Sequence, residues 1–139
     1  MEQLVADETM SAEADWTLKA MVAVAMSDGR LDSREVGLIQ QVYQDSTGRK
    51  LTANEIARVT DADATGDVMA EFAAVSTVLD KSAKEEIVRS AYLVLLADNR
   101  IAGEERKKLK DIATALQVPE VHFGSILEDL AMWMSSKKS

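Results

Sequence analysis

The chain of 139 residues has no cysteine, one proline, one histidine, six glycines and six aromatic residues. The absence of cysteine excludes disulfide frameworks, thiolate zinc sites, iron–sulfur ligation and thiol nucleophiles. The single histidine, His122, excludes a histidine-rich metal site. Sheets of short strands depend on turn residues and aromatic residues, so the scarcity of both favours an all-α fold.

Apolar residues make up 47% of the chain and charged residues 29%, which is typical of a globular domain and not of a disordered or membrane protein. We therefore expect one domain over residues 1–139, with a core over about 12–134 and frayed ends. No apolar run approaches the roughly 18 residues of a spanning helix, and the first residues lack the pattern of a secretory signal. We expect a bacterial-type cytoplasmic protein with no direct membrane insertion.

The net charge of −8 is unevenly distributed along the chain. Residues 1–80 hold 15 acids and 6 bases, whereas residues 81–139 hold 9 acids and 10 bases. The acidic part would repel a phosphate backbone, and the basic cluster Arg106-Lys107-Lys108-Lys110 is short and poor in aromatic neighbours. We expect no nucleic-acid partner.

Hydrophobic periodicity and end signals predict seven helices. They cover about residues 12–27, 32–48, 52–60, 68–79, 82–97, 103–116 and 119–134. Two stretches, 20–26 and 91–97, are apolar on every face, which predicts two fully buried central helices.

An internal repeat relates these two regions at an offset of 70 residues. Asp28-Gly29-Arg30-Leu31, followed by Glu35, aligns with Asp98-Asn99-Arg100-Ile101, followed by Glu105. Each copy predicts a helical hairpin that cannot bury its own apolar helix. We therefore predict a compact seven-helix bundle in which the two hairpins pack about a pseudo-two-fold axis.

The two turns, Ser27 to Glu35 and Ala97 to Glu105, resemble the paired Ala-Asp-Gly-x-Ile-x-x-x-Glu turns of the TerB-like family. The resemblance covers about residues 15–130. It implies a seven-helix cytoplasmic bundle linked to tellurite resistance and the stress response, with acidic residues near the turns. It also implies metal binding or assembly with partner proteins. Ser27 and Asn99 depart from the Ala and Gly of the pattern.

The repeated carboxylates give one candidate metal site, made of Asp28, Glu35, Asp98 and Glu105. Each turn reproduces only part of a calcium loop, so a competent site requires ligands from both turns. Oxygen ligands favour calcium, magnesium or manganese over zinc or copper. The alternative is structural, because acids near helix starts also cap free amides and suit the helix dipole.

A second acidic stretch, residues 61–67, places oxygen donors as a calcium loop does but has Phe72 where a bidentate glutamate is needed. We interpret it as a linker and helix cap. His122 has no recognisable catalytic partners, and we assign it a structural role. Trp16 and Trp133 are expected in the core or in a partner-binding groove.

No nucleophile, phosphate-binding loop or acid–base pair of a common type is recognisable. The expected function is a non-enzymatic binding and assembly module of the stress-response type, with or without a divalent cation, whose partners are other proteins. Two alternatives stay open, namely a small metal-dependent enzyme that uses clustered carboxylates and a purely structural protein-interaction domain without metal. The sequence sets no oligomeric state.

Overall fold

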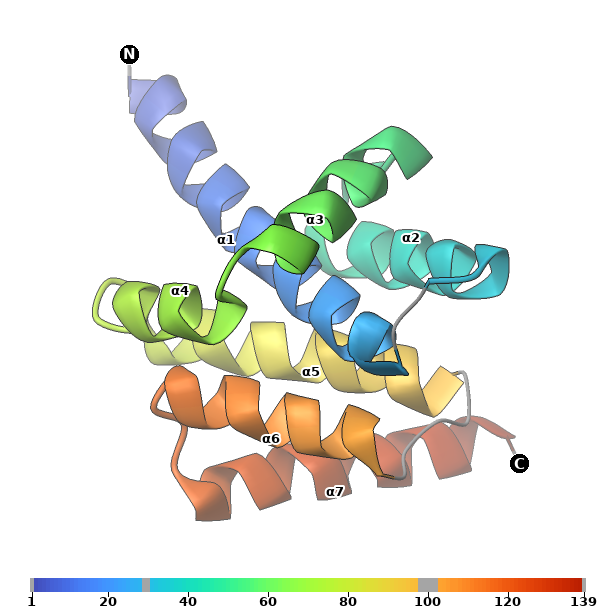
Figure 1. The fold of residues 1–139 in the computed structure, drawn as a ribbon. Coiled ribbons are helices and arrows are strands. Elements are labelled where there is room, and N and C mark those ends of the chain that lie inside the picture. The colour runs from blue at the N-terminus through green and yellow to red at the C-terminus, as the bar shows by residue number, and fades with distance from the viewer. Residues whose placement is uncertain (1, 29–30, 98–102, 139) are drawn as a thin grey trace.

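The computed structural model describes residues 2–28, 31–97 and 103–138, which form seven α-helices and one short 3₁₀-helix (Figure 1). The elements are α1 (Glu2–Ala25), η1 (Met26–Asp28), α2 (Ser33–Thr47), α3 (Ala53–Thr65), α4 (Val68–Val75), α5 (Lys81–Ala97), α6 (Glu104–Ala115) and α7 (Glu120–Lys138). No strand occurs within these ranges. The prediction of an all-α bundle with seven helices is confirmed.

The ends of α2 follow directly from its sequence. The Asp32 carboxylate accepts a hydrogen bond from the Glu35 amide at 2.8 Å, and the Glu35 carboxylate accepts one from the Asp32 amide at 3.3 Å. Together they form a capping box. At the other end Gly48 has φ 74°, a left-handed conformation that glycine adopts without a steric penalty. Both predicted signals are therefore confirmed.

Five predicted boundaries are wrong. Helix α3 ends at Thr65 and not at residue 60, and α4 ends at Val75 and not at residue 79. Helix α1 begins at Glu2 instead of residue 12, because no proline or glycine interrupts the helix-forming residues before it. Helix α5 is capped by Asp80, whose carboxylate accepts the Ala83 amide at 2.8 Å, and not by Ser82. Helix α7 continues to Lys138, beyond the expected end at residue 134.

Helices α1 and α5 are the two central helices, and they share the most extensive helix-to-helix contact. Every residue from 20 to 25 in α1 is at most 2% exposed. In α5 the residues at 90–92 and 94–96 are all buried. The predicted burial of these two stretches is confirmed except at Met26, Leu93 and Ala97, which are partly exposed.

The packing partners of the two hairpins are matched. Helix α1 contacts α2 and α6, and α5 contacts α6 and α2; α3 packs on α1 as α7 packs on α5. Exchanging α1 with α5, α2 with α6 and α3 with α7 leaves this set of contacts unchanged. An approximate two-fold relation between the hairpins requires this pattern of partners.

The core consists of two clusters of buried side chains that the central helices separate. One joins α1, α4, α5, α6 and α7, and the other joins α1, α2, α3 and α5. Trp16 packs on the edge of the first cluster, with its ring 5.4 Å from that of the buried Phe72 and the Lys19 ammonium 4.4 Å from its centroid. Trp133 is instead 49% exposed.

A search of the described residues for bilayer-spanning helices found none with the required length and hydropathy.

Candidate functional site

Of the four carboxylates predicted to hold a cation, Glu35 has a well-defined local role. Its side chain is 3% exposed and completes the capping box with Asp32 at the start of α2. This contact satisfies a backbone amide that the helix leaves without a partner. The structural role expected for Glu35 is confirmed, and binding a cation would require this carboxylate to serve both contacts.

Glu105 lies in the first turn of α6, where its charge suits the positive end of the helix dipole, and it is half-buried. The N-cap of α6 is Gly103, which offers no side-chain hydrogen bond. Acidic residues in this turn therefore provide the electrostatic stabilisation that a capping side chain supplies in α2.

The remaining two predicted ligands are described incompletely or not at all. Asp28 ends η1, and η1 packs against α6, the helix that carries Glu105. For Asp28 the structure describes the backbone only. Asp98 lies outside the described residues, as do Gly29, Arg30, Asn99, Arg100 and Ile101 of the predicted turns. Among the side chains that are described, no three histidine or acidic residues are grouped closely enough to hold a metal ion.

The stretch 61–67 does not form a calcium-type loop. Helix α3 continues to Thr65, so the backbone cannot wrap around an ion there. Asp67 instead caps α4, and its carboxylate accepts the Ala70 amide at 3.2 Å. The expected cap at Asp67 is confirmed, whereas the expected linker is wrong over residues 61–65, which belong to α3.

His122 joins two helices. Its Nε2 atom lies 2.6 Å from the Glu85 carboxylate of α5, and both side chains are about one-third exposed. Glu85 is the only polar partner that the structure gives the imidazole among the described residues. The contact fixes α7 beside α5, which is the structural role that the sequence predicted.

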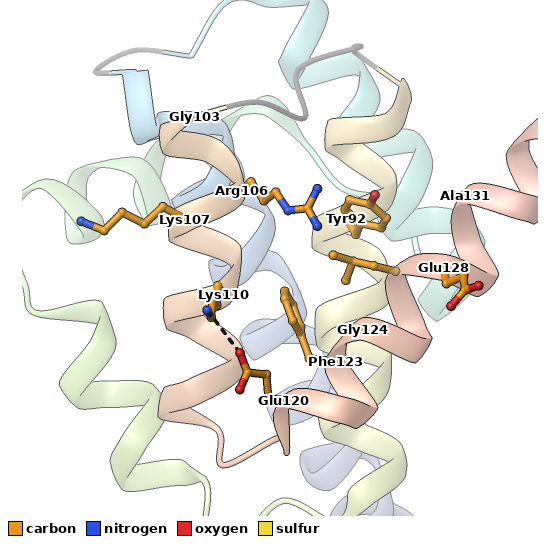
Figure 2. Close-up of a pocket in the computed structure, with 11 residues that line it drawn as sticks. Tyr92, Gly103, Arg106, Lys107, Lys110, Glu120, Phe123, Gly124, Glu128 and Ala131 are labelled. Carbon is orange, nitrogen blue, oxygen red and sulfur yellow. Dashed lines mark ion pairs between the residues drawn. The ribbon is translucent and has the colours of Figure 1, made fainter.

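A groove between α6 and α7 is the feature that the sequence did not predict (Figure 2). Helix α6 ends in a tight reversal in which Gln117 has φ 62° and the Val118 amide donates to the Ala113 carbonyl at 2.9 Å. Both α6 and α7 then pack on α5 but contact each other much less. The space left between them has a volume of about 880 Å³.

The floor of the groove is apolar and its two walls differ in charge. The described lining residues are Tyr92, Gly103, Arg106, Lys107, Lys110, Glu120, Phe123, Gly124, Leu127, Glu128 and Ala131. Tyr92, Phe123 and Leu127 form the floor and are each at most 7% exposed. The α6 wall carries the cations, and the α7 wall carries Glu120 and Glu128.

Arg106 is the cation that enters the groove. Figure 2 shows its side chain reaching across from α6 toward Tyr92, whereas Lys107 points away on the outer side of α6. Lys110 is neutralised by Glu120 of α7, at 3.5 Å. Arg106 makes no ion pair with any described residue. Its guanidinium therefore offers a planar fork of donors to a carboxylate from outside the chain.

The described groove residues include glutamate, lysine and tyrosine but no serine, threonine, cysteine or histidine. An apolar floor with one unpaired arginine is a binding arrangement. The basic cluster at 106–110 was visible in the sequence, but a charge pattern alone did not indicate that a groove lies beside it.

Comparisons of the chain with protein-family models, curated proteins and solved structures found no match. The TerB-like assignment therefore rests on the two turn motifs and stays a prediction.

Proposed function

We propose that this chain is a non-enzymatic binding module that holds an acidic segment of a partner protein in the groove between α6 and α7. The observation that supports this proposal is the placement of Arg106, whose side chain reaches over an apolar floor and makes no ion pair with a described residue. The TerB-like resemblance implies the same class of function, a cytoplasmic stress-response module that assembles with other proteins.

An amphipathic helix suits this groove. Its apolar side chains, spaced three and four residues apart, would cover Tyr92, Phe123 and Leu127. A glutamate or aspartate on its flank would pair with Arg106 in a bidentate contact. Basic residues on the opposite flank would face Glu128, so the two walls together set the orientation of the bound segment.

Binding of designed peptides tests the proposal. Two dye-labelled amphipathic helices with the same apolar face, one flanked by glutamates and one by lysines, are titrated with the protein while fluorescence anisotropy is followed. We expect the acidic peptide to bind more tightly, with an affinity that falls as salt is added.

Two variants separate the groove from general charge attraction. Arg106→Ala should weaken binding of the acidic peptide about tenfold. Arg58→Ala removes an exposed arginine of the same kind from α3 and should leave the affinity unchanged. Equal losses in the two variants, or equal affinities for the two peptides, contradict the proposal.

A divalent cation is the second candidate ligand, as the repeated turns imply. The supporting observation is that η1, which ends at Asp28, packs against α6, which begins beside Glu105. This contact brings segments from both predicted turns together. The cation would stabilise the fold and is not required by the groove.

A further inference from the structure

A second hollow lies on the other side of α5, between α2 and the end of α7. It has a volume of about 260 Å³, at the low end of the range of small-molecule sites. Its lining residues are Val42, Asp45, Ser46, Glu86, Arg89, Ser90, Leu93, Ala97 and Trp133. None of these residues lines the α6–α7 groove.

Glu86 is held in a fixed position at one end of this hollow. Its Oε1 atom accepts a hydrogen bond from the Ser46 hydroxyl at 2.6 Å and a longer one from the Ser90 hydroxyl at 3.5 Å. Ser90 is fully buried, so this contact comes from the core side. Glu86 makes no ion pair with any described residue, and its Oε2 atom makes no hydrogen bond with one. A half-buried carboxylate with one oxygen available is a partner for a cation.

The other end of the hollow is apolar. Leu93 and Ala97 follow Glu86 along α5, about 10 Å and 16 Å further along the helix axis. Trp133 of α7 lines the same end and is 49% exposed. An exposed indole beside aliphatic side chains provides a surface for an apolar stem.

The charges of the lining residues indicate which ligand charge the hollow favours. Asp45 and Glu86 contribute two negative charges and Arg89 one positive charge. Arg89 is exposed and makes no ion pair with a described residue. The described lining residues therefore carry one net negative charge, and a ligand with two positive charges would meet repulsion from Arg89.

We propose that this hollow binds a single protonated amine carried on a short apolar stem. The ammonium group pairs with Glu86, and the stem lies along Leu93 toward the indole of Trp133. The amine is either a small free molecule or the side chain of a lysine in another protein. This inference is independent of the groove between α6 and α7.

The indole N–H signals of the two tryptophans provide the readout in a nitrogen-15 NMR titration. Hexylammonium is the probe, and hexanol and hexanoate are the neutral and anionic controls of the same length. We expect hexylammonium to shift the Trp133 signal in a saturable manner and to leave the Trp16 signal unchanged. The two control compounds should have little effect, and pentane-1,5-diammonium should bind more weakly than hexylammonium.

The variant Glu86→Gln keeps the size of the side chain and a carbonyl oxygen for Ser46, and it should weaken hexylammonium binding about tenfold. Glu71→Gln, which changes an exposed carboxylate of α4 that lines neither hollow, is the matched control and should bind as the unchanged chain does. If Glu86→Gln fails to fold, Leu93→Ala serves instead, because it removes an apolar contact with the stem, keeps the Trp133 signal as the readout and should also weaken binding.

Nα-acetyl-lysine amide, which keeps the side-chain ammonium group, distinguishes the two sources of the amine. Binding as tight as that of hexylammonium indicates a lysine side chain of a protein, and weaker binding indicates a free amine. The proposal is overturned if hexylammonium and hexanol act alike, if Glu86→Gln binds as the unchanged chain does, or if no amine shifts the Trp133 signal.

Discussion

Lys110 of α6 and Glu120 of α7 form a 3.5 Å ion pair across one end of the groove (Figure 2). The pair neutralises one cation of the α6 wall and leaves Arg106 as the cation that enters the groove without an ion pair to a described residue. The side chains of the pair are 58% and 84% exposed, so the pair adds little to stability. The ion pair matters because it lowers the positive charge that a ligand meets in the groove.

Glu120→Gln should therefore strengthen binding of the glutamate-flanked peptide, because it releases Lys110 for the ligand. The free energy of unfolding should change by less than about 1 kcal/mol. Anisotropy titration and urea unfolding of the same sample measure both quantities. A weaker affinity at unchanged stability would show that the acidic segment does not lie beside Lys110.

Because the central helices are buried, truncation of one of their side chains to alanine should cause a large loss of stability. Leu95 is 2% exposed in α5, and Leu95→Ala should lower the free energy of unfolding by about 2–5 kcal/mol. Val24→Ala in α1 should cost less, since fewer atoms are removed. Val121→Ala is the matched control at a valine that is 87% exposed, with an expected change within about 0.5 kcal/mol. Similar denaturant midpoints for Val24→Ala and Val121→Ala would contradict the central position of α1.

Divalent cations should raise the melting temperature of chelator-treated protein if Asp28, Glu35, Asp98 and Glu105 share one ion. At a hundredfold excess over its dissociation constant, a cation would stabilise the fold by about 2.7 kcal/mol. Calcium, magnesium and manganese are titrated separately while unfolding is followed. The double variant Asp28→Asn, Asp98→Asn should lose the shift. No shift with any ion at millimolar concentration, or an equal shift in the double variant, would leave the turns with a structural role.

Tyr43 should make the free energy of unfolding fall at alkaline pH. Burial raises the pKa of its phenol above the usual value of 10.0, mainly because the ionised form would lose its hydration. Between the two pKa values the folded state binds more protons than the unfolded state, so stability should fall as the pH rises above about 10. Tyr43→Phe should flatten this part of the stability curve in urea unfolding measured from pH 8 to pH 11. A decline of equal slope in the variant would assign the loss to other groups.

Local features of the fold were predictable from the sequence. Asp32 and Glu35 accept hydrogen bonds from each other's backbone amides within one helical turn, so the capping box follows from local sequence. The apolar stretches of α1 and α5 have no polar face that could be exposed to solvent, so their burial follows from their composition. The errors arose where several residues could perform the same role, as at Asp80 and Ser82, or where no residue stops a helix, as before Ala12. These choices depend on small differences in local free energy.

The groove was not predictable because it depends on the distance between α6 and α7 as they pack on α5. The basic residues at 106–110 were visible, but which of them enters a cavity and which is paired follows from the placement of α7. Trp133 was assigned to the core or a groove, and the structure places it half-exposed at the rim of the second hollow. The candidate cation site stays a prediction, because Asp98 and the side chain of Asp28 lie outside the described part of the chain.

A charge reversal at Arg106 tests the proposed binding in the groove most directly. The unchanged chain and Arg106→Glu are each titrated with the glutamate-flanked and the lysine-flanked peptide, and the four dissociation constants are compared by anisotropy. The account predicts that Arg106→Glu loses affinity for the acidic peptide by more than tenfold and gains affinity for the basic one. Parallel changes for the two peptides, or four equal constants, would contradict a carboxylate contact with Arg106 in this groove.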